Sequence, residues 1–191
     1  MRQLLARGVH GLLLCHAESP EAVKAFVEAC RYPFQTIGVG TQLDVGRRGS
    51  AGQGSAAPIW GLSADAYLDV ADPWPLNPKG ELLLGLKFEN KRALANVEIT
   101  AQVPGIAFAE WGPGDMSMSF GYKNAPNPRP QELEDARNRV FTACKAAGIA
   151  FLESASADTI EASIDVGVRI CGSGEECARI GRAYAGRTMP V

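Results

Sequence analysis

The sequence has no apolar run long enough to cross a bilayer, no paired-cysteine motif and no basic cluster. A membrane-spanning helix needs about 20 consecutive apolar residues, and no run in this chain approaches that length. The five cysteines are odd in number and form no C-x-x-C pair, which is typical of reduced thiols rather than a disulfide framework. The formal net charge is -2 and the basic residues are scattered. We therefore expect a cytoplasmic protein that binds neither a membrane nor a nucleic acid.

The opening residues MRQLLARGVHGLLLC look like a signal peptide only in part. A basic start does precede leucines and a cysteine. However, Arg7 and His10 interrupt the apolar run, and Leu14 is too large for the position before a cleavage site. We therefore expect no secretion signal here.

What the sequence does contain is a regular alternation of strand-like and helix-like segments. Helix signals are clearest after Ser19, which can cap a helix that has Pro20 in its first turn. A Gly-, Ser- and Gln-rich stretch at about 36–62 has no sustained period and predicts a long loop. The predicted strands are 9–15, 81–88, 106–110, 149–152 and 166–170, and the other predicted helices are 63–70, 91–103, 131–146, 156–163 and 174–185.

Strands that alternate with helices predict a parallel sheet with right-handed crossovers. A closed (β/α)8 barrel has eight strands and usually about 250 residues, whereas this chain has 191 residues and five predicted strands. We therefore expect a single α/β domain over residues 1–191, of the TIM-barrel type but with five β/α units.

Polar side chains follow three of the predicted strands. Glu89 and Asp115 follow the second and third strands, and His16 and Glu18 follow the first. Ligands of parallel α/β folds lie beyond the carboxyl ends of the strands, so Glu89 and Asp115 could hold a hard divalent cation such as Mg²⁺ or Mn²⁺. The alternative is that both are acids at helix starts, where the helix dipole favours a negative charge.

Two longer stretches resemble a known family. KFENKRALANVEITAQVPGIAFAEWGPGDMSMSFGY resembles the segment that carries the metal ligands in the HpcH/HpaI family of class II aldolases, in which an acidic residue after one strand is followed by a GPxDLS-like loop. HAESPEAVKAFVEACRYP and the following IGVG resemble the preceding helix unit and loop of that family. The resemblance extends from about residue 9 to 186 and implies the last five β/α units of the barrel, without its N-terminal strands.

The resemblance also implies a function and a site. It implies a metal-dependent lyase that cleaves or forms 4-hydroxy-2-oxo acids, with pyruvate and an aldehyde as the products or substrates. Glu89 and Asp115 would hold Mg²⁺, Mn²⁺ or Co²⁺, and backbone N–H groups near Gly114 and Asp115 would hold the pyruvate carboxylate. Relatives are commonly oligomeric, so a homo-oligomer is expected.

Two departures from the family pattern leave alternatives open. Lys87 replaces a neutral polar residue two positions before the metal-binding Glu, where a cation would repel the metal or pair with a substrate carboxylate. Relatives place an acid/base His and a carbonyl-polarising Arg on early strands, and nothing here matches them. His16 is the candidate acid/base group, and the alternative is a packed or surface histidine.

Two other functions fit the same residues. The chain could be a catalytically incomplete barrel that needs a partner chain, because a five-stranded sheet leaves open edges. It could also be a citrate-lyase-like enzyme that acts on an acyl-CoA. The strand-end thiols Cys15 and Cys171 are expected to be small buried side chains rather than nucleophiles.

Overall fold

The computed structural model describes residues 2–187, which divide into two compact units between Ile149 and Ala150. Each unit contains parallel strands and helices, so the α/β class is confirmed. No helix in the described part of the chain combines the length and the apolar character that are needed to cross a membrane.

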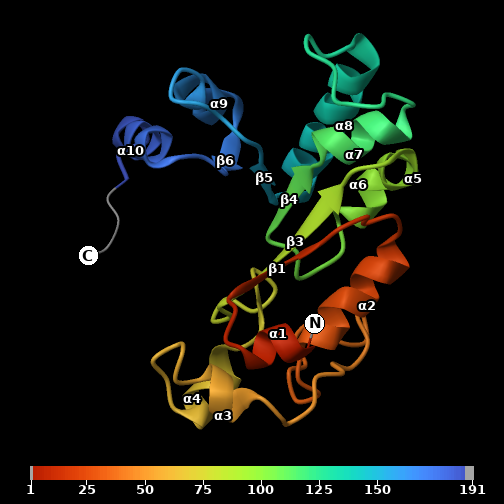
Figure 1. Cartoon of the computed structure of the whole chain (residues 1–191). Helices are drawn as coiled ribbons and strands as arrows, with labels where there is room; N and C mark the ends of the chain where they lie inside the picture. The colour runs from red at the N-terminus through yellow and green to blue at the C-terminus, as the bar shows by residue number, and fades with distance from the viewer. Residues whose placement is uncertain (1, 188–191) are drawn as a thin grey trace. The chain divides into compact units, whose positions relative to one another are not determined.

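The first unit is built on a parallel sheet (Figure 1). Its longest strand, β3 (Leu82–Phe88), lies between β1 (Gly11–Leu14) and β4 (Phe108–Trp111) and is parallel to both. A two-residue strand that the sequence did not predict, β2 (Pro73–Trp74), pairs with the start of β3. Because all these strands are parallel, their carboxyl ends meet at one edge.

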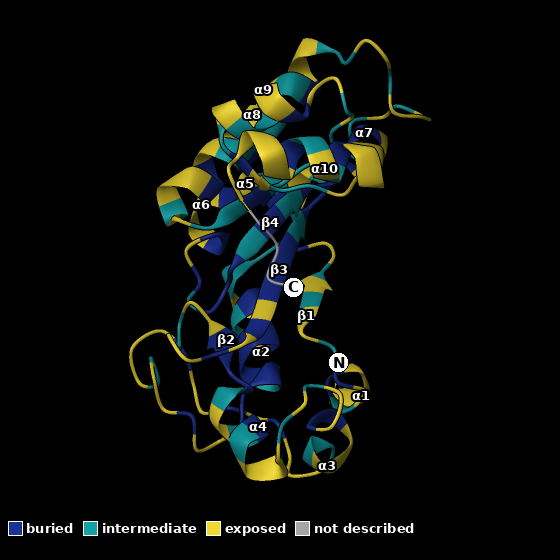
Figure 2. Ribbon diagram, turned by 90° about the vertical axis from the view of Figure 1, so that its left-hand side faces the viewer, coloured by how far each residue is buried: buried dark blue, intermediate teal, exposed yellow. Residues whose placement is uncertain are grey.

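The two faces of β3 differ in burial, as expected for a strand with period two. Figure 2 shows that β3 is largely buried. Leu83, the second residue of the strand, is 41% exposed. The Leu83 face also carries Gly85, whose missing side chain leaves room for the Phe108 ring, and half-buried Lys87. The opposite face is fully buried and carries Leu82, Leu84, Leu86 and Phe88.

Eight helices surround the strands within the described part of the first unit. The helix predicted after Ser19 is confirmed as α2 (Pro20–Cys30): Ser19 Oγ accepts a hydrogen bond from the Ala22 N–H at 3.2 Å. The longest, α8 (Gln131–Ala147), ends at Gly148 with a left-handed φ of 71°, which glycine adopts without strain. The others are α1 (Arg2–Ala6), α3 (Gln53–Ala56), α4 (Ala64–Val70), α5 (Lys91–Ala95), α6 (Val97–Thr100) and α7 (Pro113–Ser119).

Three local predictions for the first unit were wrong. The single helix expected at 91–103 is two short helices, α5 and α6, which meet at Asn96. The segment after β4 is not a loop, because Pro113 begins α7 directly. The predicted loop at about 36–62 contains α3.

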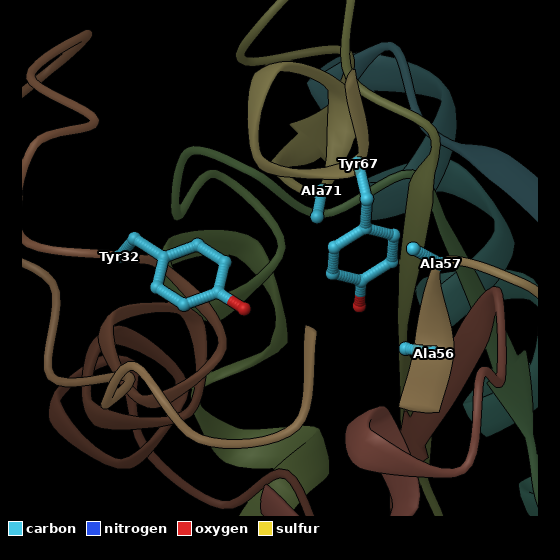
Figure 3. Close-up of a cluster of buried hydrophobic side chains, with 5 residues drawn as sticks. All are labelled: Tyr32, Ala56, Ala57, Tyr67 and Ala71. Carbon is cyan, nitrogen blue, oxygen red and sulfur yellow. The ribbon is translucent and has the colours of Figure 1, made fainter. Parts of the chain in front are cut away.

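That long connection is fixed to the unit by a buried aromatic and alanine cluster. Figure 3 shows Tyr32 and Tyr67 entering it from different segments, beside Ala56, Ala57 and Ala71. The Arg48 guanidinium packs over the Tyr32 ring at 4.4 Å and the Tyr67 ring at 5.3 Å. The connection is thus packed against the unit at Arg48, Ala56 and Ala57, while much of the rest of it is exposed.

Within residues 150–187, the second unit contains two strands and two helices. β5 (Ala150–Leu152) and β6 (Val168–Ile170) are parallel, with Phe151 opposite Val168 and a register shift before Leu152. They alternate with α9 (Ile160–Val166) and α10 (Glu175–Tyr184). All five predicted strands are therefore present. The helix α9 begins at Ile160, four residues after the predicted start at 156.

Candidate metal and substrate site

Residues from three neighbouring strand ends meet at the carboxyl edge of the first unit's sheet. Lys87 is the second-last residue of β3, and Glu89 directly follows the strand. His16 lies two residues after β1, and Asp115 lies in the first turn of α7, just after β4. The predicted site residues are thus brought to one edge, as the strand-end pattern indicated.

Glu89 is at the centre of this group. Its residue is 1% exposed, and Oε1 accepts a hydrogen bond from the His16 backbone N–H at 2.9 Å. His16 presents this N–H from a left-handed backbone with φ 50°, which is uncommon for a residue other than glycine. Glu89 Oε2 lies 2.9 Å from the Lys87 ammonium. A buried carboxylate is therefore held by one N–H group and one positive charge.

Lys87 links Glu89 to Asp115. Its Nζ is 3.9 Å from Asp115 Oδ2, and the Lys87 side chain is 23% exposed whereas the Asp115 side chain is 52% exposed. The contact with the Glu89 carboxylate raises the pKa of Lys87, which burial partly opposes. The ammonium is therefore positively charged near neutral pH, and two carboxylates lie around one cation position.

Glu110 is a further acid near this position that the sequence did not single out. It lies directly opposite Lys87 in the register of β3 and β4. Burial raises the pKa of Glu110, and the negative charge of Glu89 adds to this effect while Lys87 opposes it. The register of the two strands was needed to find Glu110, since nothing in the sequence aligns it with Lys87.

Two glycines shape the space around the carboxylates. A Cβ on Gly112 would lie 2.6 Å from Glu89 Cβ and 2.9 Å from Lys87 Cε, so a side chain there would displace both residues. A Cβ on Gly114 would meet nothing within 4 Å. Gly114 and Asp115 also lie in the first turn of α7, where backbone N–H groups have no partner within the helix. Open space and free donors therefore lie beside Asp115.

His16 lies on the solvent side of Glu89. Its ring is 59% exposed, with Nδ1 3.7 Å from Glu89 Oε1 and 3.1 Å from Asn90 Nδ2. The Asn90 amide also donates to Glu18 Oε1 at 2.8 Å. The imidazole is thus positioned at the predicted edge and remains accessible; its role as an acid/base group stays a prediction.

The burial predicted for two strand-end thiols was wrong. Cys15 is exposed and Cys171 is half-buried. Cys15 directly follows β1, which pairs on one side with β3, and this position leaves its thiol uncovered. The Cys15 thiol is therefore accessible to solvent and is not shielded by burial.

The residues around the cation position have suitable chemistry for a hard divalent metal. Two carboxylates converge on one point, Gly112 keeps that point free of a further side chain, and Mg²⁺ in proteins is commonly held by one or two carboxylates with water and substrate oxygens. No group of three or more His, Cys, Asp and Glu side chains suited to a metal occurs within residues 2–187. Water and substrate oxygens are the usual further ligands of such a pair of carboxylates.

Sequence comparisons identify relatives of this chain. The HpcH/HpaI aldolase/citrate lyase family model matches residues 1–175. A hydroxypyruvate/pyruvate aldolase of Pseudomonas aeruginosa is 34% identical over 152 residues, which is 78% of this chain and 50% of the relative. A 2-keto-3-deoxy-L-rhamnonate aldolase of Salmonella paratyphi B is 31% identical over 159 residues, 82% of this chain and 53% of the relative. The chain spans about half the length of these relatives.

Solved structures share the fold. A HpcH/HpaI aldolase/citrate lyase family protein from Burkholderia cenocepacia J2315 superposes with a TM-score of 0.69 at 24% identity, covering 97% of this chain and 66% of that protein. Macrophomate synthase superposes with a TM-score of 0.64 at 21% identity, covering 95% of this chain and 58% of that protein. The fold is therefore part of a TIM-barrel-like aldolase fold, and the chain belongs to the HpcH/HpaI aldolase/citrate lyase family.

Proposed function

We propose that the chain carries the metal site of a carbon–carbon lyase that cleaves or forms 4-hydroxy-2-oxo acids, with pyruvate and an aldehyde as the other reactants. The observation that supports this most is the convergence of Glu89 and Asp115 on one cation position at the carboxyl edge of the sheet. Membership of a family that contains pyruvate aldolases makes this the favoured chemistry for such a pair.

In this proposal Glu89 and Asp115 hold Mg²⁺, Mn²⁺ or Co²⁺ through their carboxylate oxygens. When bound, the metal would act as a Lewis acid on the 2-oxo group and so stabilise negative charge that develops on the substrate. The His16 N–H fixes Glu89 Oε1, which leaves Oε2 directed toward the cation position. Gly112 supports the same geometry, because any larger residue would displace Glu89.

The substrate carboxylate would bind beside Asp115. The N–H groups of Gly114 and Asp115 begin α7 and have no partner within that helix, and the space over Gly114 is open. The exposed His16 imidazole would then exchange a proton with the substrate hydroxyl at the same edge. The substrate carboxylate and the substrate hydroxyl are thus each assigned to a group on the chain.

Exchange of the pyruvate methyl protons in deuterated water, followed by NMR, tests the proposal without knowledge of the aldehyde. With Mn²⁺ or Mg²⁺ present, the wild-type chain should catalyse this exchange. Glu89→Gln and Asp115→Asn keep the side-chain size but remove a ligand charge, and each should lower the rate by roughly 100-fold or more. Lys79→Gln, on an exposed turn, is the control. Unchanged exchange in Glu89→Gln and Asp115→Asn would contradict the proposal.

A further inference from the structure

The Lys87 ammonium lies where a cation shared by Glu89 and Asp115 has to lie. Nζ is 2.9 Å from Glu89 Oε2 and 3.9 Å from Asp115 Oδ2. A divalent metal bound by the same two oxygens would need metal–oxygen distances of about 2.0–2.2 Å. The metal and the ammonium therefore cannot occupy this position together.

Packing keeps Lys87 at this position. The residue lies on β3 between β1 and β4, and its side chain is 23% exposed. Its Cε passes 2.9 Å from the point where a Gly112 Cβ would be, so the aliphatic part occupies the space that the glycine leaves. The Lys87 side chain is thus packed within the site and is not a surface lysine that extends over it.

The buried charge of Glu89 favours a positive group at the position that the Lys87 ammonium occupies. Glu89 is almost fully buried, so its charge needs a nearby positive group. The Lys87 ammonium lies 2.9 Å from Oε2, whereas the exposed His16 ring lies farther away, with Nδ1 3.7 Å from Oε1. In the absence of a metal the ammonium supplies that charge. When a metal binds, it has to displace the Lys87 ammonium, and the displaced ammonium then repels the metal from nearby. Both effects weaken metal binding.

We propose that Lys87 is an internal cation that competes with the divalent metal for Glu89 and Asp115, and that it thereby sets the metal affinity of the site. This inference rests on the proposed function, because it assigns the same two carboxylates to the metal. Of the two alternatives for Lys87, the inference takes opposition to the metal rather than pairing with a substrate carboxylate, because the ammonium pairs with Glu89 and Asp115.

Mn²⁺ binding to the full chain, measured by electron paramagnetic resonance of the free ion, tests the inference. Lys87→Gln removes the positive charge and should bind Mn²⁺ at least about tenfold more tightly than wild type. Lys87→Arg keeps the charge and should bind no more tightly than wild type. Lys79→Gln changes the net charge equally at a distant exposed position and is the matched control. Equal Mn²⁺ affinity in Lys87→Gln and wild type, whether strong or absent, would overturn the inference.

A second measurement uses the wild-type chain, so that it decides even if Lys87→Gln does not fold. Acetylation of lysines by a water-soluble ester, mapped by mass spectrometry, should modify Lys87 faster with saturating Mn²⁺ than without it. Lys79 should be modified at the same rate in both conditions. An unchanged Lys87 rate overturns the inference.

The two proposals fail in distinguishable ways. If Lys87→Gln binds Mn²⁺ tightly but catalyses no exchange of pyruvate protons, the competition stands and the proposed function fails. If wild type catalyses metal-dependent exchange and Lys87→Gln shows no gain in Mn²⁺ affinity, the proposed function stands and the competition fails.

Discussion

Gly112 shows how one residue without a side chain determines the geometry of the candidate site. It follows β4 and lies against both Glu89 and Lys87, where a Cβ would be 2.6 Å from Glu89 Cβ and 2.9 Å from Lys87 Cε. Gly112→Ala should therefore shift Glu89, lower the free energy of unfolding by about 1–3 kcal/mol and weaken Mn²⁺ binding. Urea unfolding and the Mn²⁺ titration measure the two effects.

Gly114→Ala is the control for that substitution. Its Cβ would meet nothing within 4 Å, and alanine favours the first turn of α7 more than glycine does. Its free energy of unfolding should equal or exceed that of wild type. A similar loss of stability in Gly112→Ala and Gly114→Ala would show that close packing against Glu89 is not the cause.

Sequence reasoning named two acids of the candidate site but not the residues around them. Glu89, Asp115 and His16 follow apolar runs, and that pattern alone predicts a shared edge. Glu110 and Gly112 could not be found in this way, because their closeness to Lys87 and Glu89 depends on the register of β3 and β4. Register comes from packing between distant segments, which a local pattern does not contain.

At the scale of elements, the N-terminal end of α2 tests whether Ser19 caps the helix. Ser19 Oγ accepts the Ala22 N–H, so Ser19→Ala should cost about 1 kcal/mol of unfolding free energy because this helix donor loses its partner. Ser19→Asp should restore most of the loss, since a carboxylate caps a helix equally well. Urea unfolding of the three proteins measures this, and an unchanged midpoint in Ser19→Ala would contradict the capping role.

Apolar runs and apolar periodicity predicted the strands β1 and β3–β6 and the helices α2, α4, α8, α9 and α10. The short elements α1, α3, β2 and α7 were not predicted. In contrast, α7 begins within WGPGD, where Gly and Pro suggest a turn, and its helical form depends on Pro113 at the first helical position. The break between α5 and α6 at Asn96 instead involves a distant segment, because the Asn96 side chain donates to the Glu18 carbonyl at 2.8 Å.

At the scale of the whole chain, the open face of the sheet suggests association. Leu13 and Leu83 lie on strands that pair with each other and are 39% and 41% exposed, although their neighbours on the opposite face of β3 are fully buried. Exposed apolar side chains that lie together on a sheet favour contact with another apolar surface. We therefore expect the chain to self-associate, in keeping with the predicted homo-oligomer.

Sedimentation velocity over a range of protein concentrations measures this association. A Leu13→Gln/Leu83→Gln double substitution should shift the chain toward the monomer. Ile99→Gln changes an exposed apolar residue on α6 and is the control. A monomeric wild-type chain, or equal shifts for Ile99→Gln and the double variant, would contradict the role of this face.

The central claim is that Glu89 and Asp115 share one cation. Anomalous diffraction from crystals soaked in millimolar Mn²⁺ tests it most directly, because the Mn²⁺ position is seen independently of activity. The claim predicts one anomalous peak within about 2.0–2.4 Å of a carboxylate oxygen from each residue, with the Lys87 ammonium displaced. A peak at only one of the two carboxylates, or an ordered ammonium between them and no peak, would contradict it.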